Sequence, residues 1–309
     1  MANTSGLSQF NLDLNDLVEE AFERCGKELR SGYDLRTARR SLNLLTIEWA
    51  NRGINLWCVE QGQIVMNTSQ AIYPLPVDTI DLLDTVVRTN NGQGNNQIDI
   101  NITRISESTY ITIPNKNANG RPIQVYVNRQ SGNIAKIPSA VLDGAISSTD
   151  TTITLVNASN LPTQGFINID SETIGYQNIV GNQILNAWRG QNGTTATSHL
   201  TAAEVFTNNL PCINVWPTPN SPGDQYTFVY YRLRRMQDAG SGSSIEDIPF
   251  RLVTAMVAGL AYNLSVKLPD VDPNRVMMLK AEYEQQWQLA ADEDREKAAI
   301  RFVPRVLFY

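Results

Sequence analysis

The spacing of apolar residues changes twice along the chain, and this change limits the folds that the chain can adopt. From Leu12 to Leu29, and again from Leu35 to Trp49, apolar residues recur every three or four positions, which is the period of an amphipathic α-helix. Between Gln63 and Arg232 the apolar runs are short and separated by Gly, Asn and Pro, as in strands joined by turns. The helical period returns from Ile248 to Ala290. The sequence therefore predicts an α+β protein, with a helical core made by N- and C-terminal helix pairs and a β-hairpin/sheet domain.

Cap residues and glycines indicate where these helices begin and end. Asp34 is expected to be the N-cap of the second helix, and Arg52-Gly53 is expected to end it. Pro249 and Pro273 are expected to lie in the first turns of the C-terminal helices, because proline suits that position. The glycine- and serine-rich stretch from Ala239 to Ser244 predicts a flexible linker.

Two β-prone segments that are far apart in the sequence are expected to pair. These are the alternating run Ile123–Val127 and the run Ile213–Pro217. Residues 137–208 between them are poor in Lys and Arg and contain only short β-prone runs. We therefore expect one domain from residues 1–136 and 209–309, and a small all-β domain, residues 137–208, inserted in a hairpin loop of the first.

Charge and composition exclude several classes of protein. The formal net charge is -6, and a protein that grips DNA electrostatically needs a clustered excess of Lys and Arg. A surface that repels DNA stays compatible with this balance. No apolar run reaches the roughly 20 residues of a membrane helix, and residues 1–14 show no secretory signal, so we expect no membrane partner. The three cysteines, Cys25, Cys58 and Cys212, are far apart and are expected to be buried and reduced.

Few residues could carry catalysis. His199 is the only histidine and is expected to be a surface or loop-packing residue. Carboxylate clusters such as Glu19-Glu20-Glu23 are expected to lie on solvated helix faces. No phosphate-binding loop, nucleophile elbow or EF-hand loop occurs. We therefore expect no enzyme activity, no catalytic residue, no cofactor, no metal and no group with a strongly perturbed pKa.

Arginines gather on the first helix pair, where acidic residues are interspersed with them. Solvated ion pairs are one interpretation of this pattern. A protein docking surface is another, because arginine is enriched at interfaces, and DNA contact is a third. The docking interpretation assigns a subunit-interface or docking role to Arg36, Arg39 and Arg40.

The chain ends in an apolar, aromatic, proline-containing segment, residues 302–309, directly after a highly charged stretch. Such a segment on a protein of this composition typically docks into another surface.

The order of several motifs resembles the head-to-tail adaptor (tail accessory factor) family of short-tailed phages. The resemblance covers residues 12–135 and 210–309. Its motifs are a first helical pair, YPLP, RISESTYITIPNKNANGRPIQVYVNR, a returning INVWPTP, the strand FVYYRLR and a C-terminal helical pair with an apolar tail.

This resemblance implies a structural virion protein that assembles in the host cytoplasm and forms a dodecameric connector ring between portal and tail, extending the DNA channel. Its implied partners are the portal protein, tail nozzle or tail fibre proteins, further copies of itself, and genomic DNA that passes without specific binding. In this family the C-terminal end reaches into the portal. The implied portal-docking residues are Phe302, Val306, Leu307, Phe308 and Tyr309.

The inserted segment resembles a small β module found in phage virion proteins, through GAISSTDTTITLVNASNLP, GFINIDSETIGY and AWRGQNGTTATSH. Its matching positions are Arg189, Gly190, Gly193, Thr194 and His199. We expect the glycines to permit tight turns, and Arg189 and His199 to hydrogen-bond loop carbonyls and so close a small sandwich.

Two other functions stay open. A cell-wall hydrolase would need a second carboxylate facing Glu19 or Glu282 across a deep cleft. A tail component that binds a host glycan or receptor would present exposed aromatics, such as Trp188 and Tyr176, on one flat face.

Overall fold

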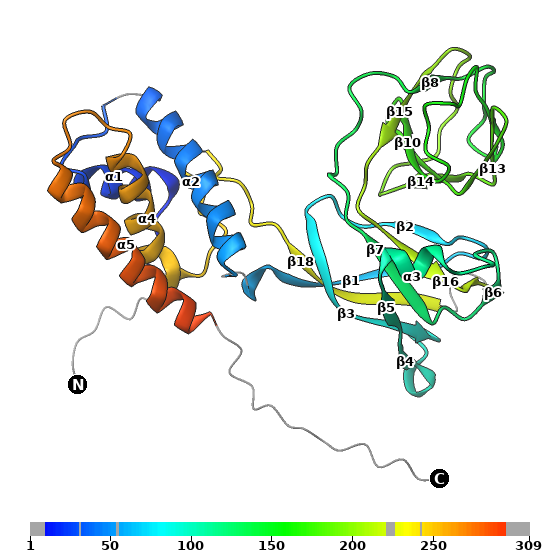
Figure 1. The fold of residues 1–309 in the computed structure, drawn as a ribbon, viewed down its shortest axis with the longest axis horizontal. Helices are drawn as coiled ribbons and strands as arrows, with labels where there is room; N and C mark the ends of the chain where they lie inside the picture. The colour runs from blue at the N-terminus through cyan, green and yellow to red at the C-terminus, as the bar shows by residue number, and fades with distance from the viewer. Residues whose placement is uncertain (1–9, 31, 54–55, 221–225, 242, 295–309) are drawn as a thin grey trace, which may run out of the picture. The chain divides into compact units, whose positions relative to one another are not determined.

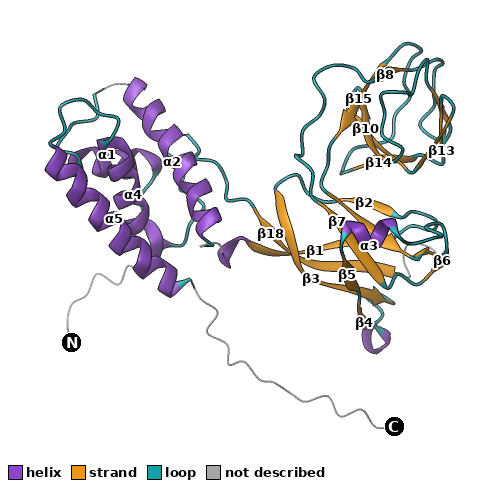
Figure 2. Ribbon diagram, in the orientation of Figure 1, coloured by secondary structure: helices purple, strands orange, loops and turns teal. Residues whose placement is uncertain are grey.

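The structure is a computed structural model that describes residues 10–30, 32–53, 56–220, 226–241 and 243–294. The chain divides into two compact units, residues 1–58 with 235–309 and residues 59–234. The first unit is helical and the second is built of strands, so the expected α+β class is confirmed (Figures 1 and 2). All three cysteines are buried, as expected.

The helical unit is built from both ends of the described chain. Its core helix, α4, is buried along most of its length and packs against the other three α-helices, so that α2 and α5 flank it (Figure 1). A β-carbon on Gly259 would lie 2.8 Å from Tyr283 and 2.9 Å from Leu45, so this glycine allows close packing of the three helices. The elements of the unit are α1 (Leu14–Arg24), α2 (Gly32–Arg52), η1 (Leu56–Cys58), η3 (Phe250–Leu252), α4 (Val253–Ser265) and α5 (Pro273–Glu293).

Two of the four predicted helix ends are confirmed and two are wrong. Pro249 is the N-cap of η3, one residue before the helical segment, and α4 itself begins at Val253. Pro273 occupies the first turn of α5, and α2 ends at Arg52 as expected. The prediction for Asp34 is wrong, because α2 begins two residues earlier at Gly32 and Asp34 lies in its first turn. There the carboxylate still favours the helix, since negative charge interacts well with a helix N-terminus.

The expected flexible linker after the last strand is tied to α2. The backbone N–H of Ala239 donates to Asn43 Oδ1 and its carbonyl accepts from Arg39 Nε, both at 2.8 Å. These two contacts hold Ala239 against the helix, which glycine and serine content alone did not indicate.

The β unit contains two four-stranded sheets outside the insertion. Strand order in the first is β1-β18-β3-β4, all antiparallel, and in the second β2-β16-β7-β5, with β5 parallel to β7. The predicted long-range pair is confirmed, because β7 and β16 are antiparallel with Val125 opposite Val215. The bounds are β1 Val59–Val65, β2 Ile72–Pro74, β3 Thr79–Thr89, β4 Ile98–Asn101, β5 Thr103–Ile105, β7 Gln124–Asn128, β16 Cys212–Trp216 and β18 Tyr226–Arg234, with η2 Gly94–Asn96, α3 Glu107–Ile111 and a parallel pair of β6 Asn119–Gly120 with β17 Thr218–Pro219.

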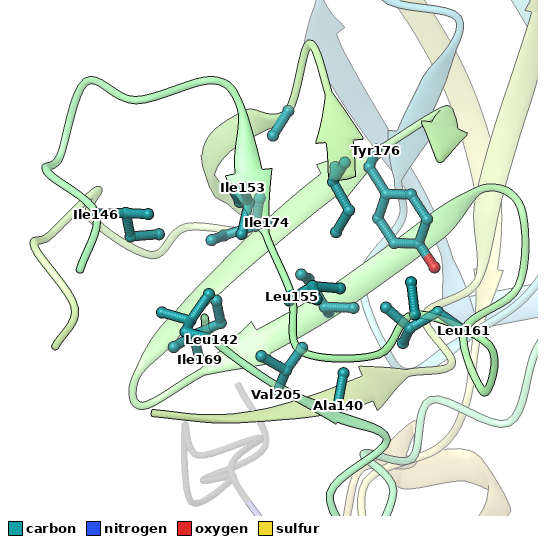
Figure 3. Packing of buried hydrophobic residues seen from close by; sticks show 14 residues of the cluster. Ala140, Leu142, Ile146, Ile153, Leu155, Leu161, Ile169, Ile174, Tyr176 and Val205 are labelled. Atoms are coloured by element: carbon teal, nitrogen blue, oxygen red, sulfur yellow. The ribbon is translucent and has the colours of Figure 1, made fainter. Parts of the chain in front are cut away.

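Between β7 and β16 the chain forms a five-stranded sheet, β14-β11-β10-β15-β8, and a three-stranded sheet, β12-β13-β9. Figure 3 shows the apolar side chains that pack between them, among them Ile153, Ile174 and Tyr176. The bounds are β8 Ala140–Val141, β9 Ile153–Thr154, β10 Gly165–Ile169, β11 Glu172–Tyr176, β12 Asn178–Val180, β13 Gln183–Leu185, β14 Trp188–Gln191 and β15 Glu204–Asn208.

The two ends of this insertion lie side by side. The N–H of Gly132 donates to the carbonyl of Asn209 at 2.7 Å, and the N–H of Ala135 donates to that of Thr207 at 2.8 Å. The insertion also shares a compact unit with the strands around it, so its boundary at residues 137–208 stays a prediction.

Candidate functional sites

The insertion contains a buried cluster of charged side chains around Glu172. This residue begins β11, directly after a tight turn in which Asp170 has a positive φ of 50°. The Glu172 side chain is fully buried, and Arg189 of β14 binds it with Nε 2.8 Å from Oε1 and Nη2 2.8 Å from Oε2. A bidentate contact of this kind is the strongest form of arginine–carboxylate pair.

Three further donors complete the coordination of Glu172. The N–H of Gly190 donates to Oε1 at 2.9 Å, and the N–H of Thr197 donates to Oε2 at 3.0 Å. His199 places Nε2 2.9 Å from Oε2 and Nδ1 2.7 Å from Asp170 Oδ2. Arg189 also donates to the carbonyls of Ser147, Asp150 and Thr197, so the cluster joins several loops of the insertion.

The electrostatics of this cluster favour an ionised Glu172. Burial by itself raises the pKa of Glu172, but hydrogen bonds from Arg189, Thr197, His199 and Gly190 outweigh burial and lower the pKa to about 2. A general acid or base needs to exchange a proton near the working pH, and it must reach its substrate. Glu172 does neither, so the cluster is arranged to stabilise the insertion.

Two expectations about this cluster are wrong. Arg189 does bind loop carbonyls, but His199 is buried and contacts two carboxylates. The expectation that no pKa is strongly perturbed fails at Glu172, because the hydrogen bonds to its buried carboxylate outweigh burial and lower its pKa. The sequence held one signal, two carboxylates, Asp170 and Glu172, in the short polar segment between Ile169 and Ile174.

The helical unit contains a second unusual carboxylate, Glu246. It is buried, and its Oε1 has no hydrogen-bond partner among the described atoms. Burial raises the pKa of Glu246 to about 7, while Arg39 opposes the shift and Asp247 adds to it. This carboxyl group therefore also departs from the expectation of unperturbed pKa values.

The carboxylates considered for a hydrolase have ordinary structural surroundings. Glu282 accepts a hydrogen bond from Arg24 Nη1 at 2.7 Å, which joins α5 to α1. Glu19 is exposed on α1.

Among the residues that the structure describes, no group of three His, Cys, Asp or Glu side chains could hold a metal ion. No described helix has the length and apolar character of a membrane span.

Only one of the two aromatics considered for glycan binding is accessible. Tyr176 is fully buried and its hydroxyl donates to the Pro162 carbonyl at 2.9 Å. Trp188 is half-buried at the start of β14.

One face of α2 is exposed and combines arginines with apolar side chains. Its members follow one another at spacings of three and four, on the side away from buried Leu42 and Trp49. Neither of its arginines pairs with an acidic side chain among the described residues, and like charges at i,i+4 weaken a helix slightly. We call this face the α2 stripe: Tyr33, Arg36, Arg40, Leu44 and Ile47.

The structure thus brings together two of the three predicted docking arginines. Arg36 and Arg40 lie in the α2 stripe, whereas Arg39 donates to the Ala239 carbonyl and belongs to the internal contacts of the helical unit. Their role as interface residues stays a prediction.

A stripe of opposite charge lies on α1. Asp16, Glu19 and Glu23 are exposed at spacings of three and four, and within the described part of the chain none of them has an arginine or lysine at ion-pair distance. Their neighbour Glu20, by contrast, pairs with Arg24 at 2.9 Å. We call these three residues the α1 stripe.

The predicted portal-docking residues Phe302, Val306, Leu307, Phe308 and Tyr309 lie outside the described residues.

Comparison with known proteins does not identify a family for this chain. No protein-family model matches the chain, and no curated protein sequence matches it.

Proposed function

We propose that the chain is a structural virion protein, a head-to-tail connector whose copies form a closed ring between portal and tail and extend the DNA channel. The resemblance in motif order supplies the family, and the dodecameric number of subunits comes from the resemblance alone. The observation that carries the proposal is the presence of two exposed, oppositely charged stripes on one helical unit.

A ring of identical subunits needs two different surfaces that fit each other, because each copy contacts its two neighbours through opposite sides. The α1 stripe carries three carboxylates, and the α2 stripe carries two guanidinium groups. Within one described chain no ion pair joins Arg36 or Arg40 to the α1 stripe. Contact between the α2 stripe of one copy and the α1 stripe of the next would neutralise both.

The composition of the α2 stripe also favours a protein partner. Tyrosine and arginine are enriched at the centres of interfaces, and Leu44 and Ile47 add apolar area that is exposed in the single chain. Arg36 and Arg40 would position the neighbour, while burial of Tyr33, Leu44 and Ile47 would supply most of the free energy of association.

The test is assembly on the portal of the same phage, imaged by negative-stain electron microscopy and sized by native mass spectrometry. The wild type is expected to form rings. Arg36→Glu/Arg40→Glu should block them, Glu19→Arg/Glu23→Arg should do the same, and the chain carrying all four changes should recover assembly. Lys280→Glu, an exposed change on α5, is the matched control and should assemble normally.

Two results would contradict the proposal. The first is wild-type protein that neither binds portal nor forms rings at any concentration. The second is ring formation by Arg36→Glu/Arg40→Glu at the wild-type level, which would remove the α2 stripe from the interface.

Removal of residues 301–309 is a separate test of portal docking. If the C-terminal segment docks into the portal, the shortened chain should lose portal binding while its helical unit stays folded.

A further inference from the structure

A cleft of about 470 Å³ lies between the insertion and the strands that carry it, within the β unit. Its volume falls in the range of small-molecule sites. Every residue that lines it is uncharged, although Lys, Arg, Asp and Glu make up 18% of the chain. The side chains that matter most are Asn117, Asn119, Gln177, Asn178, Asn186 and Trp188.

The two walls of the cleft are fixed to each other. Phe166 of the insertion packs with Ala71, Ile72 and Cys212 of the supporting strands in one buried apolar cluster. Buried Gln70 donates from Nε2 to Gln191 Oε1 of the insertion at 3.1 Å. A site whose walls are held in place loses less entropy when it binds a ligand.

Polar groups in the cleft are partly pre-arranged. Gln177 Nε2 donates to Asn117 Oδ1 at 3.2 Å, and this contact crosses from the insertion to the loop before β6. That bond leaves the Nδ2 donors of Asn117 and the Oε1 acceptor of Gln177 for another molecule. Asn119, Asn178 and Asn186 are exposed and add further amide donors and acceptors.

Trp188 supplies a rigid aromatic surface in the same cleft. Its ring packs on Gly175 of β11, where a β-carbon would lie 3.2 Å from Trp188 Cε3. The glycine therefore lets the indole lie close to the strand, and the ring also packs against the cluster that joins the two walls. An indole fixed in this way offers an apolar face at little cost in conformational entropy.

We propose that this cleft binds an uncharged oligosaccharide. A pyranose ring has an apolar C–H face that stacks on an indole, and hydroxyls at its edge that both donate and accept hydrogen bonds. Asn and Gln amides are suited to such hydroxyls, because each carries donors and an acceptor. One ring on Trp188, with its hydroxyls toward Asn119 and Asn178, satisfies both kinds of group.

Other ligand classes fit the lining less well. Phosphate-bearing ligands, including nucleic acids, are recognised through arginine, lysine or clustered backbone N–H groups, and the cleft contains no cationic side chain. An acidic sugar would bring a carboxylate that meets no positive charge there. The proposal is independent of ring formation, because none of the cleft residues belongs to the helical unit.

The experiment uses the full-length protein on a microarray of bacterial surface glycans that carries neutral, uronic-acid and sialic-acid chains, followed by calorimetric titration of the strongest neutral hit. Binding to neutral chains only is expected. Asn119→Ala/Asn178→Ala should weaken the affinity at least about tenfold, because two hydrogen bonds to the ligand are lost. Trp188→Phe keeps an apolar ring and should weaken it less than Trp188→Ala.

Asn160→Ala is the matched control, since it is an exposed asparagine of the insertion outside the cleft, and it should bind as the wild type does. Circular dichroism melting of each variant separates loss of folding from loss of binding. The proposal is overturned if no neutral chain binds, if charged chains bind equally well, or if folded Asn119→Ala/Asn178→Ala keeps full affinity.

Discussion

Replacing Glu172 by glutamine tests whether the buried cluster stabilises the insertion. The carboxylate accepts from two arginine nitrogens, two backbone N–H groups and His199. In Glu172→Gln the new amide NH₂ must face either two or three of these donors, and Arg189, only 7% exposed, loses its counter-ion. Breaking a buried ion pair by removing one partner costs about 3–5 kcal/mol.

The pH dependence gives an independent magnitude for the same cluster. The fall of the Glu172 pKa from its ordinary 4.5 to about 2 corresponds to about 3 kcal/mol, at about 1.4 kcal/mol per pKa unit. Because the folded-state pKa lies below that of the unfolded chain, this stabilisation is complete above about pH 4.5 and is lost as the pH falls toward 2. Both estimates amount to a large share of the stability of a small domain.

The assay is urea unfolding of the full-length protein, equilibrated at each pH and followed by pulsed hydrogen–deuterium exchange of peptides from residues 137–208. Glu172→Gln should lower the unfolding free energy of these peptides by about 3–5 kcal/mol at pH 7 and flatten their pH dependence below pH 4.5. Glu204→Gln, an exposed carboxylate of the same insertion, should change it by less than about 0.5 kcal/mol. A loss below about 1 kcal/mol in Glu172→Gln, with the acid dependence intact, would refute the reasoning.

Three further predictions concern the helical unit. Glu246→Gln should stabilise it at pH 8 by about 1–3 kcal/mol and have little effect below pH 4.5, measured by urea unfolding, because a raised folded-state pKa means that ionisation opposes folding. Tyr283→Phe should cost about 1–3 kcal/mol, since Trp49 Nε1, which donates to the Tyr283 hydroxyl at 3.2 Å, would become a buried donor without a partner. Gly259→Ala should lower the melting temperature, because its β-carbon would lie 2.9 Å from Leu45 and overpacking costs about 1–3 kcal/mol, more than the gain in helix propensity.

Each of these changes has a matched control in the same unit. Asp292→Asn changes an exposed carboxylate on α5 and should alter the free energy of unfolding by less than about 0.5 kcal/mol. Tyr33→Phe removes an exposed hydroxyl and should cost little. Gly32→Ala places a β-carbon where no atom lies within 4 Å and should leave the unit at least as stable. Equal effects in a variant and its control would contradict the corresponding argument.

The sequence predicted the parts of the fold that depend on local patterns. Helical spacing located α1, α2, α4 and α5, and Pro273 marked the first turn of α5, because periodicity and proline geometry act within a few residues. The pairing of β7 with β16 was also within reach, since both are alternating apolar runs beside an insertion of different composition. The prediction that Asp34 is the N-cap of α2 was wrong because an aspartate is favourable both at the N-cap and in the first turn of a helix. Only the backbone angles distinguish these two positions.

The candidate sites depend on contacts between distant segments, which local patterns do not contain. The sequence shows that Glu172 and Arg189 are present, but not that they pair. Their burial against each other follows from the pairing of β11 with β14. Asn119 and Asn178 both line the cleft, but they come from different segments of the chain. These segments are close only because the insertion packs on its supporting strands. Each of the two stripes, in contrast, lies on a single helix. The structure was needed only to show that Arg36 and Arg40 are exposed and that Arg39 instead donates to the Ala239 carbonyl.

The two buried carboxylates make the two units respond to pH in opposite directions. Glu172 contributes stability to the β unit that grows between about pH 2 and 4.5, whereas Glu246 removes stability from the helical unit between about pH 4.5 and 7. Below pH 4.5 the β unit is therefore the one weakened, and above it the helical unit is. Since the proposed ring contacts lie on α1 and α2, and both helices belong to the unit that contains Glu246, assembly that requires this unit to be rigid should tolerate mild acid better than alkali. Glu246→Gln should remove that difference while leaving the acid sensitivity of residues 137–208 unchanged.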